Sequence, residues 1–492
     1  MIRRQSSERI DVSHLLLINQ AYALSYVACY ALGVWHTSFA LTGNAQTTAI
    51  FEAKFGWTEN ETIHYNTIIS SASIVGLTVG SFLGGPLIKN GRRKGAIIAN
   101  SIGIISSAIS MIGTVPFLTF GRFVLGIAAG VYNVIFGKMV IETMPEKSAQ
   151  KYAMWHNASI CFGLMAAFCM GAFLPDQEDT EAIKEDELWR VIFLMPAVIG
   201  IVSILLITLV FRQEPIAYCI MQGNEEEAKR HMGRLYRKAD PNSPETIEQL
   251  LELQYKYQKR GTTMDASKTT FKQAVCGRKY RRASWTCFIL NCFSQLSGID
   301  AINVYANRLL VQMAEQGSGS FPLTPIQGTY VIGCCNAIPA LIAILTIQMF
   351  GRRTIYITGQ FFMALSLFIC GYSILMGWNL ASFISLCMLV SWYQLSQGSV
   401  AWLYVAEVTV DAASGFSAAA KFINLMIISF TFEYMLNSPL KVHGAIWYFG
   451  AMTILGFFFC LCFVRETRGL TDLEKKMLYS PKSILDEQII EI

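Results

Sequence analysis

The sequence predicts an all-α membrane protein with twelve transmembrane helices in two pseudo-symmetric six-helix bundles. Hydrophobic residues make up 53% of the chain and charged residues 15%, with a mean hydropathy of +0.41, whereas soluble proteins carry about 25% charged residues. The word Gly-Arg-Arg occurs twice, at 91–93 and at 351–353. About fifty residues after each copy a glutamate ends an apolar run, Glu142 in the first half and Glu407 in the second. These similar offsets indicate a duplicated membrane unit.

The apolar runs define the expected spans, because about twenty residues cross a hydrocarbon core of roughly 30 Å as a helix. The predicted spans are 15–40, 63–88, 95–113, 117–141, 152–174, 189–211, 283–310, 328–349, 354–376, 380–406, 415–437 and 444–464. The predicted domains are a first bundle over 1–211, a linker over 212–282, a second bundle over 283–464 and a tail over 465–492.

The linker is the longest polar stretch of the chain. It holds a charged helical pattern from Asn224 to Lys238, a Pro-bounded turn from Asp240 to Pro244 and an amphipathic run from Ile247 to Lys259. These patterns predict short helices that connect the two bundles. Any protein partner is expected to bind at this linker or at the tail.

Basic residues set the expected orientation in the bilayer. Loops on the side of both termini carry Arg92, Arg93, Lys94, Lys147, Lys151, Arg352 and Arg353. The loop at 175–188, on the opposite side, carries seven acids and one lysine. The positive-inside rule therefore predicts cytoplasmic termini, in the plasma membrane or an organelle membrane. The net charge of +5 reflects this asymmetry and does not indicate nucleic-acid binding, since no basic stripe is interleaved with aromatic residues.

The motifs of enzymes and ATP-driven pumps are missing from the sequence. It contains no phosphate-binding Gly-rich loop, no Walker lysine and no nucleophile elbow. The thirteen cysteines show no metal-ligand spacing with histidines. We therefore expect neither an enzyme nor a bound metal or cofactor.

The two glutamates call for cationic partners, because a carboxylate at a helix end inside a bundle is costly when unpaired. We expect Arg92 or Arg93 to pair with Glu142. We likewise expect Arg352 or Arg353 to pair with Glu407. Such pairs would latch neighbouring helices in one conformational state and separate in another. A single Gly-Arg-Arg would be explained by an ordinary glycine cap with basic flanks, but two copies with distant glutamates favour the latch. Arg122, which opens the fourth span, is expected to join the first network.

An ordered series of motifs gives the chain a resemblance to a known family. The series is Gly91-Arg92-Arg93, Gly121-Arg122-Phe123 with Gly126 and Gly130, Glu142 with Pro145, Glu214-Pro215, Gln295 to Ile299, Gly351-Arg352-Arg353, Trp402 to Glu407, and Glu466 to Gly469. The chain resembles the major facilitator superfamily, and within it a divergent member of the sugar porter family that includes the glucose transporters. The resemblance implies twelve helices in two six-helix domains that work by alternating access.

The resemblance also implies a substrate site. Sugars are bound by matched hydrogen-bond donors and acceptors together with an aromatic face. The family positions fall on Asn157, Gln295, Asp300, Asn336, Gln394, Trp402 and Asn424. Three of them differ from the usual family residue: Asn157 replaces Gln, Asp300 replaces Asn and Gln394 replaces Glu. Each of the seven residues also fits a plain packing role between helices.

Asp300 is a carboxylate in mid-span, which must be paired, protonated or functional. His36 lies in the first span, near the position at which proton-coupled family members have an aspartate. We expect a His36–Asp300 interaction that would make transport pH-sensitive, since histidine titrates near neutrality. The alternative is a static polar contact.

Several departures from the family pattern weaken the expected latch. Ile88 and Gln348 replace acids that precede the Gly-Arg-Arg words, and Ser414 replaces an arginine. Span ten lacks proline at 398–401 and is therefore expected to be stiffer. Two interpretations follow. The first is a secondary transporter of a hexose or similar small polar solute, facilitative or proton-coupled. The second is a transport-impaired protein of the same fold that serves as a sensor or a structural subunit of a membrane complex.

Overall fold

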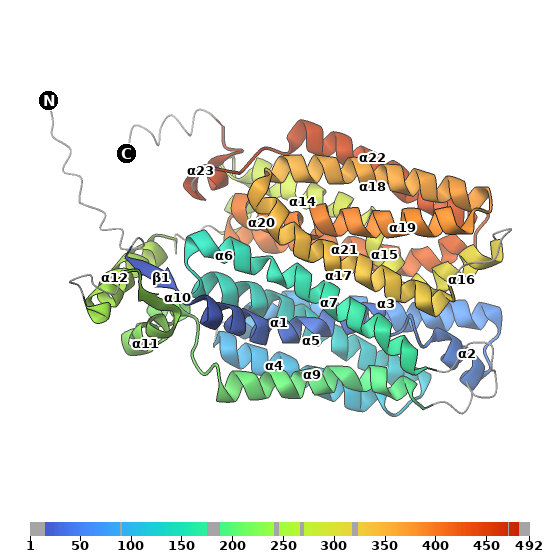
Figure 1. Ribbon diagram of the computed structural model, residues 1–492, viewed down its shortest axis with the longest axis horizontal. Helices are drawn as coiled ribbons and strands as arrows, with labels where there is room; N and C mark the ends of the chain where they lie inside the picture. Colours follow the sequence, from blue (N-terminus) through green and yellow to red (C-terminus); the bar gives the residue numbers. More distant parts are fainter. Residues whose placement is uncertain are drawn as a thin grey trace.

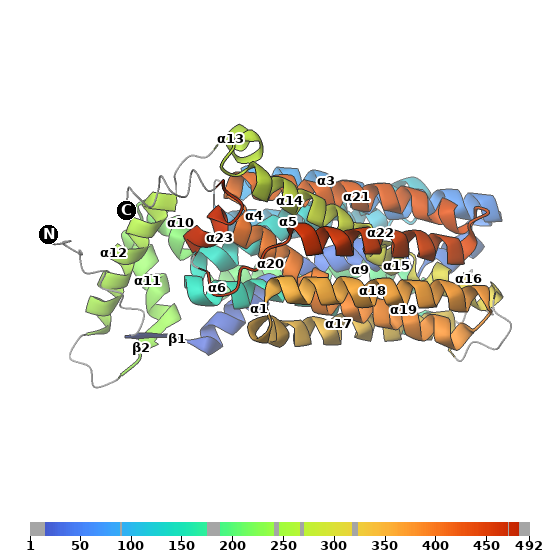
Figure 2. The same ribbon diagram turned by 90° about the horizontal axis from the view of Figure 1, so that it is seen from above.

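The computed structural model describes residues 15–88, 91–174, 187–240, 246–265, 270–316, 323–470 and 472–481. Long helices lie side by side along one axis (Figure 1). The short helices of the linker gather at one end of them, together with α6 and α23 (Figure 2). We call this the linker end and the opposite one the far end.

The first bundle follows the predicted order of spans. Its elements are α1 (Gln20–Thr42), α2 (Thr48–Phe55), α3 (Glu59–Ile88), α4 (Arg92–Ser110), α5 (Val115–Thr143), α6 (Glu146–Ala153), α7 (Trp155–Cys169) with the 3-10 turn η2 (Met170–Phe173), and α9 (Trp189–Leu209). The short helix α2 lies outside the predicted spans, and α6 overlaps the fifth of them only at residues 152 and 153. The acidic stretch 175–186 lies outside the described residues.

The second bundle contains two broken spans. Its elements are α14 (Arg281–Gln295), α15 (Ile299–Val304), α16 (Ala306–Gln316), α17 (Pro325–Met349), α18 (Arg352–Leu375), α19 (Asn379–Tyr393), η3 (Gln394–Gly398), α20 (Ser399–Val408), α21 (Asp411–Leu436) and α22 (Lys441–Phe463). Span seven breaks at Gly298, whose φ of 80° lies in the left-handed region that favours glycine. A side chain there would also collide with the Phe449 ring.

Span ten corrects the expectation of a stiffer helix. The segment Gln394–Gly398 is a π-helix between α19 and α20. A π-turn widens the helix and is a recognised cause of kinks, often at functional sites. The interruption that proline was expected to supply is therefore present without proline.

Eight of the described helical segments are long and apolar enough to cross a membrane by length and composition. The other predicted spans correspond to α1, α4, the α19–η3–α20 series and α21. The series is divided by the π-helix, and α4 begins with three basic residues, which explains the weaker signal of these two spans.

Helices form in both predicted stretches of the linker, but Tyr236–Lys238, which the pattern predicted as helical, is a strand. Its helices are α10 (Ile216–Met221), α11 (Glu225–Leu235), α12 (Ile247–Asp265) and α13 (Phe271–Cys276). The strand β2 (Tyr236–Lys238) pairs antiparallel with β1 (Leu16–Ile18), with Leu17 opposite Arg237. The predicted turn lies mostly outside the described residues, at 241–245. This pairing ties the segment before α1 to the linker.

The two bundles contact each other along α7 and α17 and along α3 and α21. Gln46 Nε2 donates to Thr329 Oγ1 at 2.8 Å near the far end. The hydroxyls of Ser71 and Ser429 lie 3.1 Å apart. The structure therefore holds the bundles together from the middle of the molecule toward the far end.

Candidate functional site

A chain of amide hydrogen bonds crosses from one bundle to the other. Asn157 of α7 donates through Nδ2 to Gln394 Oε1 at 2.9 Å. Gln394 Nε2 donates to Asn336 Oδ1 at 2.7 Å, and Asn336 Nδ2 donates to Asn303 Oδ1 at 3.1 Å. Gln394 is the first residue of the π-helix and is only 4% exposed. Three of the seven predicted substrate residues thus lie in direct contact.

Gln295 and Asp300 form a second contact. The left-handed turn at Gly298 joins α14 to α15 and brings the two side chains together. Gln295 Nε2 donates to Asp300 Oδ2 at 2.8 Å, while the buried Gln295 Oε1 has no hydrogen-bond partner among the described residues. An oxygen that is buried without a donor is costly, so this amide is a candidate to accept a hydrogen bond from a solute.

Trp402 lies between two basic side chains. Its ring centroid lies 6.0 Å from that of His156, and the Lys421 ammonium lies 5.1 Å from the Trp402 ring centroid. The same ammonium interacts with the Tyr393 hydroxyl and electrostatically with Asp300. The sequence analysis missed Lys421, although a single lysine inside the apolar run 415–437 is a recognisable signal.

Asn424 lies one helical turn beyond Lys421 but has local partners. Its Nδ2 donates to the Ala420 carbonyl oxygen at 2.8 Å and contacts Cys292 Sγ at 3.3 Å. This geometry is that of a residue joining α21 to α14. A substrate role for Asn424 stays a prediction.

The expected His36–Asp300 interaction is not formed. His36 is fully buried, and its Nε2 lies 3.0 Å from Asn100 Oδ1. Asn100 in turn donates to Ser203 Oγ at 3.0 Å. The hydrogen bond of His36 is therefore made within the first bundle, because α4 presents an amide to it, while Asp300 accepts from Gln295 in the second bundle. The prediction compared only spans one and seven, so it did not identify Asn100 of α4 as the partner of His36.

At the linker end both expected ion pairs are formed. Arg92 donates to both Glu142 oxygens, each at 2.8 Å. Arg352 Nη2 lies 3.0 Å from Glu407 Oε1. The bidentate geometry of the first pair is the stronger arrangement. Each pair joins helices of one bundle, α4 to α5 and α18 to α20, so neither crosses between bundles.

The second pair has additional partners from the segment after α22. Thr467 Oγ1 donates to Glu407 Oε2 at 2.7 Å, and Lys475 Nζ lies 3.7 Å from Glu407 Oε1. Lys475 belongs to α23 (Asp472–Met477). The sequence has Ser414 at the position of the second cation expected near Glu407. In the structure, Lys475 of α23 supplies a second cation to Glu407.

Two further glutamates, whose structural role the sequence analysis missed, cap the Gly-Arg-Arg helices. The backbone nitrogens of Arg92 and Arg93 donate to Glu214 Oε2 at 3.0 and 3.1 Å. In the second bundle the backbone nitrogens of Arg352 and Arg353 donate to the Glu466 carboxylate at 2.8 and 3.1 Å. A carboxylate satisfies the free N–H groups of a helix start and complements its dipole. Glu214 and Glu466 occupy matching positions after spans six and twelve, and this correspondence was the sequence signal for their shared role.

Burial raises the pKa of the Glu214 carboxyl, although the backbone N–H groups of Arg93 and Arg92 act in the opposite direction. The side chains of Arg93 and Arg353 bond backbone carbonyls instead of the glutamates. Arg93 Nε donates to the Ile207 oxygen at 3.2 Å, and Arg353 Nη2 donates to the Leu461 oxygen at 3.0 Å. The first arginine of each word is thus the one that pairs with the glutamate.

Arg122 does not join the first network, which corrects that prediction. It is 1% exposed, and its guanidinium donates to the carbonyl oxygens of Phe39 and Ala40, each at 2.7 Å. Arg122 lies near the far end of α5, whereas Glu142 lies at the linker end of that helix. Twenty residues of helix separate them by about 30 Å. Arg122 therefore ties α5 to the last turns of α1.

Substitution of Gly351 by alanine is expected to lower stability. An added methyl group would displace the Glu466 carboxylate that caps α18, and loss of a helix cap costs about 0.5–2 kcal/mol. Thermal unfolding in detergent should show the lower midpoint. Gly137 is the matched control, since a side-chain carbon there meets nothing within 4 Å. Equal midpoints for Gly351→Ala and Gly137→Ala would contradict the capping role.

Docking of the linker is expected to weaken in acid. Burial lowers the pKa of His231 in α11 from 6.5 to about 4, and its Nδ1 lies 2.8 Å from the Glu214 carbonyl oxygen. Because the folded pKa is lowered, this stabilisation is complete above pH 6.5 and is lost as the pH falls toward 4, by roughly 3 kcal/mol in all. Amide hydrogen exchange of α11, corrected for intrinsic rates, should therefore become faster as the pH falls from 6.5 toward 4. His231→Phe should flatten this pH dependence, and an unchanged slope would refute the assignment.

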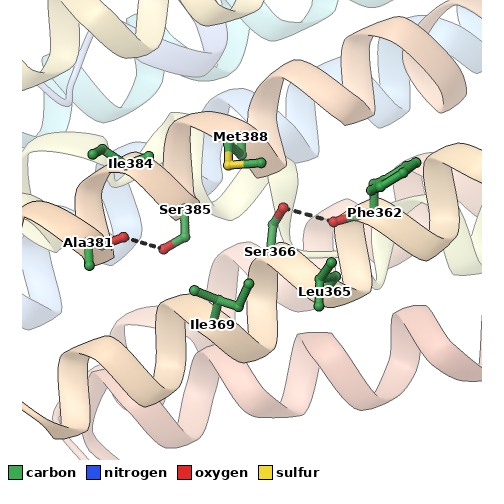
Figure 3. Close-up of a pocket in the computed structure, with 8 residues that line it drawn as sticks. All are labelled: Phe362, Leu365, Ser366, Ile369, Ala381, Ile384, Ser385 and Met388. Carbon is green, nitrogen blue, oxygen red and sulfur yellow. Dashed lines mark hydrogen bonds between the residues drawn. The ribbon is translucent and has the colours of Figure 1, made fainter.

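A cavity of about 240 Å³ lies between α18 and α19, away from these polar residues (Figure 3). The hydroxyls of its two serines donate within their own helices, Ser366 to the Phe362 oxygen at 2.8 Å and Ser385 to the Ala381 oxygen at 2.7 Å. The other lining residues are apolar: Phe362, Leu365, Ile369, Ala381, Ile384 and Met388. A cavity without a free donor does not suit a hydroxylated solute.

In the described part of the chain, no group of three or more His, Cys, Asp or Glu side chains is placed to hold a metal ion.

Solved structures share this fold. The structure of the proton:xylose symporter XylE bound to 6-bromo-6-deoxy-D-glucose matches with a TM-score of 0.77 and 20% identity, covering 94% of this chain and 100% of that one. A partially occluded inward-open conformation of XylE from E. coli gives a TM-score of 0.74 and covers 92% of this chain and 100% of that one, at 20% identity. The protein therefore has the major facilitator fold of twelve membrane helices in two six-helix bundles.

The family is established by sequence. The family model described as "Sugar (and other) transporter" matches residues 26–476, and the chain belongs to that family of multi-pass membrane transporters. Its relatives include Hexose transporter 1 of Plasmodium vivax, 23% identical and covering 94% of this chain and 93% of that one. The D-xylose-proton symporter of Escherichia coli (strain K12) is 24% identical and covers 85% of this chain and 87% of that one.

Proposed function

We propose that this protein moves a hexose or similar small polar solute across its membrane by alternating access, either down the solute gradient or with a proton. The observation that carries the proposal is the hydrogen bond from Asn157 to Gln394, because it joins the two bundles through side chains that suit a hydroxylated solute. The names of relatives, which include hexose and xylose transporters, support a sugar as the solute.

The amide chain suggests how a solute would be bound. Asn157, Gln394 and Asn336 satisfy one another here, and buried amides must keep partners. A sugar hydroxyl both donates and accepts, so it can replace an amide–amide bond without leaving either amide unpaired. Binding would thereby exchange the direct link between the bundles for a link through the solute.

The ion pairs at the linker end act within bundles in this proposal. Arg92–Glu142 and Arg352–Glu407 hold helix ends together, so that each bundle moves as a unit. We assign the linker end and both termini to the cytoplasmic side, following the basic residues there. We also propose that the domains end at residues 211, 282 and 464. Any protein partner would bind the linker or the tail.

Uptake by the purified protein in liposomes tests the proposal. We expect saturable counterflow of labelled hexoses that unlabelled hexose inhibits and empty liposomes lack. Stimulation by an inward proton gradient, abolished by a protonophore, would identify proton coupling. Absence of uptake for every hexose and pentose tested, together with stoichiometric co-purification with a membrane complex, would instead support the sensor or structural role.

A further inference from the structure

Lys421 is a half-buried charge inside a membrane span, and the family pattern does not account for it. A lysine inside a membrane span costs at least a few kcal/mol unless it is paired or functional. Its ammonium lies over the Trp402 ring at 5.1 Å and beside the Tyr393 hydroxyl. It interacts electrostatically with Asp300, yet these two described residues form no direct ion pair.

Among the described residues, Asp300 likewise has no direct contact with a cationic side chain. Its Oδ2 accepts the Gln295 amide at 2.8 Å, and its side chain is only partly buried. Because Lys421 and Asp300 do not contact each other directly, a solute between them would meet hydrogen-bond donors at Lys421 and acceptors at Asp300. An ammonium only donates hydrogen bonds, whereas an ionised carboxylate only accepts them.

The balance of charge indicates which solutes fit. Lys421 and Asp300 together carry no net charge, so an acidic or an amino solute would add an uncompensated charge to a site inside the membrane. A hydroxyl group is neutral and can serve either residue, accepting from Lys421 or donating to Asp300. Two hydroxyls on one solute would satisfy both residues.

We propose that Lys421 and Asp300 form a split charge pair that binds two hydroxyl groups of an uncharged sugar, and that this pair determines specificity. The inference rests on the proposed function and adds to it the class of sugar. Sugars lacking either hydroxyl would leave one of these two charges without its hydrogen bond to the solute, and such losses discriminate far more strongly than a lost apolar contact. The site therefore selects neutral sugars over deoxy, acidic and amino analogues.

Competition assays in proteoliposomes test this selection. Monodeoxy-D-glucose analogues, glucuronate and glucosamine would compete with labelled glucose counterflow by wild type, K421M, D300N and the double variant. We expect wild type to bind at least one deoxy analogue about 100-fold more weakly than glucose. K421M should reduce that ratio to about 10-fold or less at one hydroxyl, and D300N at a different one. Lys272→Met, at an exposed linker lysine, should leave all ratios unchanged.

The outcomes separate this inference from the proposed function. Robust glucose uptake with the same analogue ratios in wild type, K421M and D300N would overturn the split pair and leave the transporter intact. Stronger competition by glucuronate than by glucose in wild type would also overturn it. Absence of hexose uptake by wild type would overturn both. If K421M fails to assemble, the double variant, which leaves neither charge unpaired, supplies the ratios.

Discussion

Replacement of Glu407 by alanine is expected to destabilise the protein by about 3–5 kcal/mol and to abolish uptake. The Glu407 side chain is 3% exposed and is contacted by Arg352, Thr467 and Lys475. Removing one partner of a buried ion pair leaves uncompensated charge, which costs this much. Here two cations would be left facing each other. Thermal unfolding in detergent measures the loss.

The pseudo-symmetric residue Glu142 supplies the comparison. It pairs with Arg92, and its side chain is 10% exposed. Glu142→Ala should therefore cost less than Glu407→Ala, because no lysine from the tail joins that pair in the described contacts. Glu407→Gln keeps the shape and one acceptor, so its cost should be intermediate. A loss below about 1 kcal/mol for Glu407→Ala would mean that the pair behaves as an exposed salt bridge.

The repeats made the fold and the ion pairs predictable from sequence. Two copies of Gly-Arg-Arg with a distant glutamate each identified Glu142 and Glu407 as partners of these words, because a carboxylate inside a bundle needs a cation. The sequence left open which arginine of each word forms the pair. Span order followed from hydropathy alone. The pairing of β1 with β2 was not predictable, since three-residue strands carry no useful periodicity.

The contacts within the candidate site were not predictable from the sequence. Gln295, Asp300, Asn336 and Gln394 were predicted as members of a site, and that role stays a prediction. No spacing rule indicated which amides bond one another. His36 was assigned to Asp300 by analogy between spans, while Asn100 on the neighbouring helix was the actual partner. Arg122 begins the fourth span and Glu142 ends it, so the length of α5 keeps Arg122 away from the ion pair that it was predicted to join.

The amide chain between the bundles gives the second large prediction. Gln394→Leu should reduce hexose uptake by roughly 100-fold or more, because it leaves Asn157 Nδ2 and Asn336 Oδ1 without their shared partner at about 1–3 kcal/mol each. It also removes a group that we assign to the solute. Initial rates of counterflow, normalised to reconstituted protein, measure the effect.

A double-mutant cycle distinguishes a solute site from a simple contact between bundles. Asn157→Ala and Gln394→Ala should be strongly non-additive in uptake, as expected for residues in direct hydrogen bond. Ser429→Ala is the matched control, because it removes another hydrogen bond between the bundles, to Ser71 at 3.1 Å, outside the amide chain. If Ser429→Ala reduced uptake as much as Gln394→Leu did, adhesion of the bundles would account for both losses. A change of less than about threefold at Ser429 beside a large loss at Gln394 would locate solute binding at the amides, since a typical hydrogen bond contributes only about 1 kcal/mol.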